Sequence, residues 1–253
     1  MLSLEVALLS DQGGRKYHED ACGHWHSPAQ LCCVLADGAG GHGGGDIASK
    51  LSVQELIGRF ARAPTHEAEA LTHLLRQTND VLIEQRWPGT ARQNMYSTVV
   101  CLVIDMVGHS AHWAHAGDSR MYWFRGGQLI CRTHDHSIVQ SMVDAGLVAE
   151  ADMRHHAKRS ELSSALGVAA DELEVSGGDS ADRVRPGDVF LLCSDGVWEH
   201  LDDSVLQRTL AAAASAKAWI DALDAEVKAA TRHKPSFDNY SALVVWAAPQ
   251  SAT

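Results

Sequence analysis

The sequence predicts an α+β fold, a central sandwich of two antiparallel β-sheets flanked by helices. Three observations predict it: strand-like segments lie near both ends of the chain, an antiparallel series of strands fills the middle, and paired helical segments separate them. The chain has 253 residues, and we find no linker, internal repeat or low-complexity segment in it. We therefore expect a single domain over residues 1–253.

The first third of the chain predicts two strands followed by two helices. Apolar residues alternate over residues 4–8, which predicts a strand. The apolar segment LCCVLA (31–36) predicts a buried strand that stops at Asp37. Apolar residues then recur at helical spacing within 53–60 and again within 71–82, which predicts two amphipathic helices.

The middle of the chain predicts an antiparallel meander. Residues 97–131 have sequences typical of strands, and Gly126-Gly127 supplies one of the turns between them. Residues 137–170 then contain only short segments with helical spacing, which polar residues interrupt. A strand-like segment returns near Leu173. This part is typical of an appendage rather than of the core.

The last quarter predicts a second buried strand, two helices and a closing strand. The segment VFLLCS (189–194) is continuously apolar up to its last residue and leads directly to Asp195. Two helical stretches follow, the second over residues 216–227. The closing strand YSALVVWA (240–247) begins two residues after Asp238.

Composition excludes several classes of protein. The 32 acidic residues outnumber the 21 basic ones and give a net charge of -11, which argues against a nucleic-acid binder. The first twelve residues resemble neither a signal peptide nor a membrane anchor, and no later apolar run reaches the roughly 18 residues of a spanning helix. We expect a cytoplasmic protein without a membrane partner.

Cysteine and histidine usage gives no sign of thiol or zinc chemistry. The six cysteines form no CxxC pair and mostly lie in apolar runs, so we expect buried, reduced thiols at Cys22, Cys32, Cys33, Cys101, Cys131 and Cys193. The fifteen histidines are scattered and form no zinc motif in a helix or strand context.

Three aspartates share one local context at the ends of predicted buried strands. They are Asp37, Asp195 and Asp238. Carboxylates that converge on one edge become tolerable when they ligate hard divalent cations, and magnesium and manganese prefer such oxygen ligands. An isolated Asp-Gly after a strand is more often simply a turn, and spacing alone does not prove that the three converge.

Five segments resemble, in the correct order, the motifs of the metal-dependent protein phosphatases of type 2C, particularly their compact bacterial members. The similarity runs from about residue 10 to residue 245. The segments are SDQGGRKYHEDA (10–21), LADGAGGHGGGDIAS (35–49), AHAGDSRMYWFRGGQL (114–129), LLCSDGVWEHL (191–201) and DNYSALVVW (238–246). The fold of that family agrees with the architecture read from the apolar patterns.

The resemblance implies a metal centre. Asp37 would bridge two cations, and the Gly38 carbonyl would bind one of them. Asp195 and Asp238 would complete this pair of sites, and Asp118 would help to hold a third ion. The implied cofactors are Mn²⁺ or Mg²⁺, two bound tightly and a third more weakly.

The resemblance also implies the substrate side of the site. Arg15 would bind the substrate phosphate, and Glu19 and Asp20 would lie in the surroundings of the metals. Residues 134–176 would form a mobile flap beside the site. The chain departs from the family at Ala39, which removes a proton donor sometimes assigned to that position and leaves His42 as the nearest substitute.

Further departures are His18, which precedes the Glu-Asp pair, and Tyr96, a bulky ring where the family packs closely. The implied activity is hydrolysis of phosphoserine and phosphothreonine in proteins by a metal-activated water, with Arg15, Asp37 and His42 as the catalytic residues. The implied setting is a monomer that opposes a Ser/Thr kinase. Two alternatives stay open: a noncatalytic binding domain of the same fold, and a metal-dependent phosphoesterase of small molecules.

Overall fold

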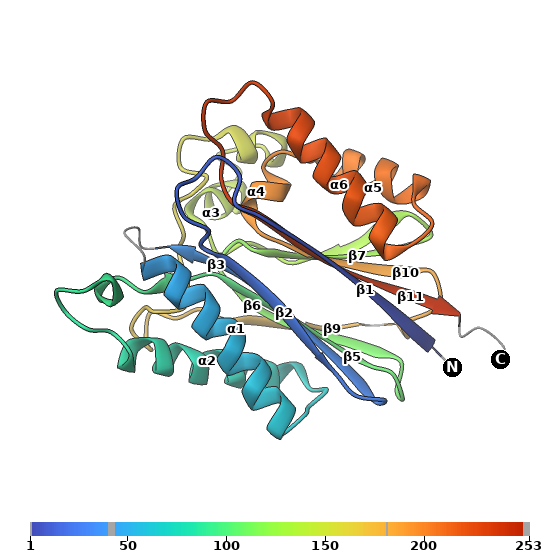
Figure 1. Ribbon diagram of the computed structural model, residues 1–253, viewed down its shortest axis with the longest axis horizontal. Coiled ribbons are helices and arrows are strands. Elements are labelled where there is room, and N and C mark those ends of the chain that lie inside the picture. The colour runs from blue at the N-terminus through green and yellow to red at the C-terminus, as the bar shows by residue number, and fades with distance from the viewer. Residues whose placement is uncertain (1, 40–43, 181, 250–253) are drawn as a thin grey trace.

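Two antiparallel sheets stack face to face in the computed structural model, which describes residues 2–39, 44–180 and 182–249 (Figure 1). The strand order of one sheet is β1 (Leu2–Asp11), β11 (Tyr240–Pro249), β10 (Asp188–Cys193), β7 (Arg120–Arg125) and β8 (Gln128–Arg132). The order of the other is β2 (Asp20–His26), β3 (Gln30–Ala39), β5 (Val99–Asp105), β6 (Ser110–Ala116) and β9 (Ser176–Asp179), and β4 (Tyr96–Ser97) pairs with the end of β3. The predicted sandwich is confirmed.

Helices cover the outer face of each sheet (Figure 1). On the β3 sheet lie α1 (Gly44–Arg62) and α2 (Ala68–Glu84), and on the β10 sheet lie α5 (Asp203–Ala212) and α6 (Ala216–Thr231). A single-turn helix, α4 (Asp195–Trp198), follows β10 directly. The helix pairs therefore match the two pairs predicted from apolar spacing.

Each sheet is buried on both faces, which explains why its strands have continuous apolar sequences. One apolar core lies between the sheets and contains Leu35, Leu102, Phe190 and Leu243. Separate cores lie between each sheet and its helices. The strand ends are thereby held rigidly at one edge of the sandwich.

Two strands differ from the sequence-based expectation. The strand β2 was not predicted, because polar residues alternate along it at the edge of a sheet and it contains no apolar run. The strand expected to stop at residue 36 continues to Ala39, because Gly38 and Ala39 pair with Ser97 and Tyr96 of β4. Asp37 therefore lies inside β3, near its end.

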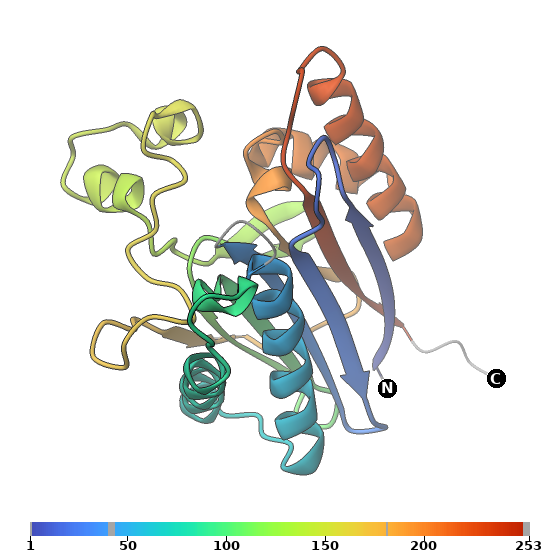
Figure 2. The ribbon, with the colours of Figure 1, turned by 60° about the vertical axis from the view of Figure 1, so that its left-hand side comes forward.

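Between β8 and β9 the chain leaves the sandwich and forms two short helices, α3 (Ile138–Asp144) and η2 (Glu150–His155), in a lobe that projects from the body (Figure 2). A further short helix, η1 (Ala91–Gln93), precedes β4. We propose that the lobe is the flap of residues 134–176 within a single domain. In the part of the chain that the structure describes, no helix has the length and apolarity needed to cross a membrane.

Candidate active site

Four aspartates line one cavity of about 180 Å³ at the edge of the sandwich. Asp37 comes from β3 and Asp118 from the turn between β6 and β7, whereas Asp195 begins α4 and Asp238 directly precedes the Asn239 that leads into β11. The structure thus brings together residues that lie far apart in the sequence. The other residues around the cavity are Arg15, Glu19, Gly38, Ala39, Thr98, Ser160, Leu162 and Asn239.

Backbone contacts fix the position of Asp37. Its backbone N–H donates to the Thr98 hydroxyl (3.1 Å), and its carbonyl accepts from the Thr98 N–H (2.8 Å). The next residue, Gly38, lies so close to the start of α1 that a Cβ atom there would come within 2.0 Å of the Gly45 carbonyl oxygen. Only glycine fits at this position, where the family resemblance requires an accessible carbonyl.

The turn that carries Asp118 is equally constrained. Gly117 has a φ of +98°, a conformation that side chains disfavour, and a Cβ there would meet the side chain of Thr98 at 2.8 Å. Asp118 itself is 4% exposed. Its carboxylate therefore reaches the cavity from a turn whose backbone has little freedom.

Arg15 lies at the rim of the cavity in the loop between β1 and β2. Its Nη2 donates to Asp238 Oδ2 at 2.5 Å, while 54% of the side chain stays exposed. Asn239 holds this loop: its side-chain NH₂ donates to the carbonyls of Gln12 (2.7 Å) and Tyr17 (2.9 Å), and its Oδ1 accepts from the Glu19 N–H. No local pattern in the sequence singles out Asn239, whose place directly after Asp238 is the available signal.

Electrostatic repulsion between the carboxylates is strong. Burial raises the pKa of Asp37 well above its usual value, and Asp20, Asp195, Asp118 and Asp238 raise it further. The pKa of Asp195 is raised in the same way, first by burial and then by Asp118. Burial and the nearby Asp135 raise the pKa of Asp118 to about 7, against the opposing effect of Arg120.

The donor set fits hard divalent cations. Asp195 Oδ1 is buried and has no hydrogen-bond partner among the described residues, and the same holds for Glu19 Oε1. Within residues 2–39, 44–180 and 182–249, no three acidic, histidine or cysteine side chains gather tightly enough to form a compact ligand group. The aspartates instead surround the cavity, an arrangement suited to Mg²⁺ or Mn²⁺ ions that keep several water ligands.

A comparison with family models identifies the chain. The model of protein phosphatase 2C matches residues 14–244. This chain belongs to the protein phosphatase 2C family.

Individual relatives agree with the family match. The chain is 31% identical over 211 residues to the serine/threonine protein phosphatase PstP of Mycobacterium tuberculosis, an alignment that covers 83% of this chain but only 39% of PstP. It is 36% identical to the structure of PppA, a key regulatory component of T6SS in Pseudomonas aeruginosa, with a TM-score of 0.75 and coverage of 96% of this chain and 97% of PppA. A structure of the PstP catalytic domain in complex with two manganese ions is 26% identical, with a TM-score of 0.80 and coverage of 98% and 100%.

Of the remaining predicted site residues of this protein phosphatase 2C chain, some line the cavity and one lies outside its lining. Glu19 lies on its wall, whereas Asp20 pairs with Asp37 in the β2–β3 register and accepts a hydrogen bond from the Ser194 hydroxyl (2.8 Å) behind it. Ala39 lies on the wall as well. His42 lies outside the described residues.

His18 and Tyr96, at which the chain departs from the family, each contact a neighbouring side chain. His18 Nε2 lies 2.7 Å from the Ser10 hydroxyl, which places the imidazole beside β1. Tyr96 is the register partner of Ala39, and the Arg86 guanidinium stacks on its ring at 4.5 Å. The bulky ring is therefore accommodated beside the cavity through a cation–π contact.

The cysteines have the character expected of structural thiols. All six are free; Cys22 and Cys131 are half-buried, and the other four are buried. Burial raises the pKa of the Cys22 thiol to about 12 and raises that of Cys193 further. A thiolate nucleophile is therefore disfavoured at the strand that leads to Asp195.

Proposed function

We propose that this chain hydrolyses phosphoserine and phosphothreonine in proteins, using water activated by Mn²⁺ or Mg²⁺. The observation that carries the proposal is the meeting of Asp37, Asp118, Asp195 and Asp238 around one cavity, with Arg15 at its rim. The family match and the names of the relatives, which are serine/threonine protein phosphatases, support this activity.

In this mechanism some residues would bind the cations and others would bind the substrate. Bound cations would supply an activated water and would offset negative charge on the phosphate. Asp37, Asp195, Asp238 and the Gly38 carbonyl would hold two of them tightly, and Asp118 would hold a third more weakly. The complex of the PstP catalytic domain with two manganese ions supports the first two sites.

Arg15 would bind and orient the substrate phosphate. A planar guanidinium can donate two parallel hydrogen bonds to phosphate oxygens, and this fixes the phosphorus relative to the cavity. Glu19 and Asp20 would support the metal surroundings from the loop and from β2. The exposed position of the Arg15 side chain leaves it accessible to a protein substrate.

The biological setting is proposed on the family resemblance and, for the cytoplasm, on the apolar pattern of the sequence. A monomer in the cytoplasm would oppose a Ser/Thr kinase by removing the phosphate that the kinase adds. The alternatives were a noncatalytic binding domain and a phosphoesterase of small molecules. The convergence of the aspartates argues against the noncatalytic domain, and the names of the relatives argue against a phosphoesterase of small molecules.

A substrate panel tests the proposed activity. Phosphoserine and phosphothreonine peptides should be hydrolysed in the presence of Mn²⁺ with a higher kcat/KM than sugar phosphates or nucleotides. A preference for sugar phosphates would assign the site to small phosphoesters. Metal binding without turnover of any phosphoester would assign the chain to the noncatalytic class.

Arg15→Met is expected to lower kcat/KM for phosphopeptides by about 10- to 100-fold, since it removes charge-assisted hydrogen bonds to phosphate. Arg15→Lys should recover only part of this loss, because an ammonium cannot form the two-pronged contact. Steady-state kinetics on one phosphopeptide measures both variants. The matched control is Arg208→Met, another exposed arginine paired with one carboxylate, Glu226. A normal kcat/KM in Arg15→Met would remove Arg15 from the phosphate site.

His42 is proposed to protonate the leaving serine oxygen from its imidazole, because Ala39 cannot. A general acid contributes typically 10²- to 10⁴-fold, and its effect grows with the basicity of the leaving group. We expect His42→Ala to slow phosphopeptide hydrolysis at least about tenfold more than hydrolysis of p-nitrophenyl phosphate, whose leaving group needs no proton. Equal losses on the two substrates would contradict the acid role and would leave a metal-bound water as the proton donor.

A further inference from the structure

Trp198 connects two of the candidate metal ligands. It is 1% exposed and ends α4, the helix that Asp195 begins. Its indole Nε1 donates a hydrogen bond to the backbone carbonyl of Asp118 at 2.9 Å. One helical turn and one buried hydrogen bond therefore join Asp195 to the turn that carries Asp118.

The orientation of the indole is fixed by Arg120. The guanidinium carbon of Arg120 lies 3.8 Å from the centroid of the Trp198 ring. Arg120 is itself held by two hydrogen bonds to the buried Asp135, at 2.9 and 2.7 Å. The indole ring is thus stacked on a guanidinium that Asp135 holds in place, and the indole N–H points at the Asp118 carbonyl.

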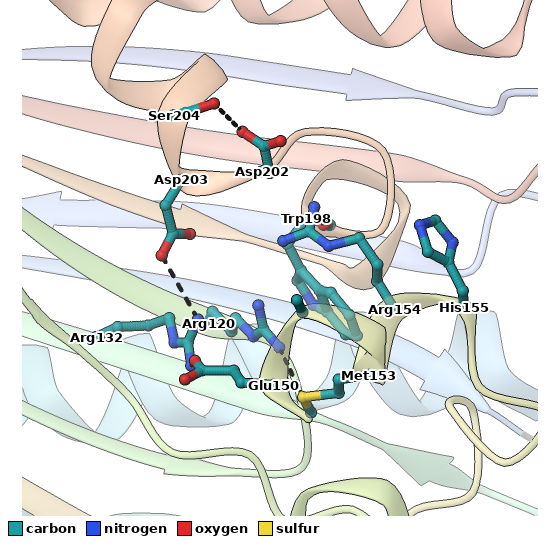
Figure 3. Close-up of a pocket in the computed structure, with 11 residues that line it drawn as sticks. Arg120, Arg132, Glu150, Met153, Arg154, His155, Trp198, Asp202, Asp203 and Ser204 are labelled. Carbon is teal, nitrogen blue, oxygen red and sulfur yellow. Dashed lines mark hydrogen bonds and ion pairs between the residues drawn. The ribbon is translucent and has the colours of Figure 1, made fainter. Parts of the chain in front are cut away.

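Asp135 belongs to the start of the flap, and η2 adds a second contact between the flap and the same tryptophan. Arg154 Nη1, in η2, donates to the Trp198 carbonyl at 3.2 Å, and the neighbouring Met153 sulfur lies 3.8 Å from Arg120 Nη2. Figure 3 shows both flap side chains reaching toward Trp198 and Arg120. These residues line a cavity of about 510 Å³ that lies between η2 and the start of α5.

We propose that Trp198 is a positioning residue that couples the flap to Asp118. Its N–H holds the Asp118 backbone and its carbonyl accepts from Arg154, so a contact that docks the flap and the hydrogen bond that positions Asp118 meet at one residue. The proposal rests on the function proposed above, in which Asp118 serves the third, weaker cation. It predicts that changes at Trp198 alter that weak site and spare the two tight ones.

Trp198→Phe tests the inference because it keeps an aromatic ring beneath Arg120 and removes the N–H. It also removes part of the buried indole ring, a loss of volume that the matched control shares. Calorimetric titration of Mn²⁺ into the metal-stripped full chain should show unchanged tight binding. The weak binding step should lose about three- to tenfold in affinity, the size expected from one net hydrogen bond. Phosphopeptide turnover should need a correspondingly higher Mn²⁺ concentration.

Trp219→Phe is the matched control. Trp219 is also fully buried in the same helix-covered core, and its Nε1 donates to the Thr209 hydroxyl at 3.0 Å, between α5 and α6. We expect a comparable fall in Tm with no change in the Mn²⁺ titration. If both variants lose stability and both bind the weak Mn²⁺ normally, Trp198 has only a structural role and the inference is wrong.

Arg154→Met tests the flap side of the coupling without touching the core. It removes the donor to the Trp198 carbonyl and should weaken the same Mn²⁺ step. Hydrogen exchange in residues 138–155 should become faster as well. Combined with Trp198→Phe, its effect on the weak step should be smaller than the product of the two single effects. Effects that multiply would contradict a shared path.

Asp118→Asn separates failure of the inference from failure of the proposed function. The proposed function requires this variant to lose the weak Mn²⁺ step. If Asp118→Asn loses it and Trp198→Phe does not, the coupling alone is wrong. If Asp118→Asn keeps it, the assignment of the third cation to Asp118 is wrong, and the coupling proposal fails with it.

Discussion

Exhaustive treatment with EDTA, followed by removal of the chelator, is expected to lower phosphopeptide turnover at least about a thousandfold, equal to roughly 4 kcal/mol of transition-state stabilisation. The reason is that the attacking water loses its proton near neutral pH only when it is bound to a cation. An oxygen-only site also binds Mg²⁺ and Mn²⁺ weakly enough for a chelator to remove them. Turnover before chelation, after chelation and after addition of each metal measures the effect.

Chelation should leave the fold in place, because the three apolar cores contain none of the four aspartates. Near-UV circular dichroism should stay unchanged while turnover disappears. Addition of Mn²⁺ or Mg²⁺ should restore activity and raise Tm, since a ligand that binds only the folded state stabilises it. Full turnover by the chelated protein would refute a metal-activated mechanism.

Asp37→Asn and Asp195→Asn are each expected to lower turnover at least about 100-fold, because even residues that merely support metal ligands typically contribute 10- to 100-fold. The metal-stripped variants should be at least as stable as the metal-stripped wild type at neutral pH. The raised pKa of each carboxyl gives the sign: the folded protein holds the proton more tightly than the unfolded chain, so ionisation at rising pH costs stability. The advantage of asparagine should vanish toward pH 4.

Asp188→Asn is the matched control for these variants. Asp188 begins β10, the strand that leads to Asp195, and is buried with a two-pronged ion pair to Arg125. Its replacement should lower Tm, since Arg125 loses its buried carboxylate partner and keeps only the exposed Asp182 and the Arg183 carbonyl, and should leave turnover nearly unchanged. If Asp195→Asn keeps more than about a tenth of wild-type turnover, a barrier change of only ~1.4 kcal/mol, the ligand assignment is wrong.

The sequence predicted the fold best at strands that are buried on both faces. β10 and β11 are covered on both faces, so they appear as continuous apolar runs, and the aspartates beside them, Asp195 and Asp238, stand out as polar residues at strand ends. Convergence of those ends could not be derived from spacing, because it depends on which strands pair. Asp118 could not be predicted from local pattern either, because it lies in a turn and does not directly follow an apolar run. Only the family resemblance identified it.

Other features depend on contacts that no local pattern encodes. Asn239 binds two carbonyls of the β1–β2 loop across more than 200 residues of sequence, and β2 pairs along an edge with polar residues. Trp198 looks like any core residue in the sequence. Its hydrogen bond to Asp118 spans 80 positions and depends on the pairing of β7 with β10, which places Arg120 opposite Cys193.

Calorimetric titration of Mn²⁺ into the metal-stripped protein tests most directly whether these carboxylates hold the activating cations. The wild type should bind two Mn²⁺ ions tightly and one more weakly. Asp37→Asn and Asp195→Asn should each lose tight binding, and Asp188→Asn should bind as the wild type does. Unchanged tight binding in both Asp37→Asn and Asp195→Asn, or no Mn²⁺ binding by the wild type, would contradict the account.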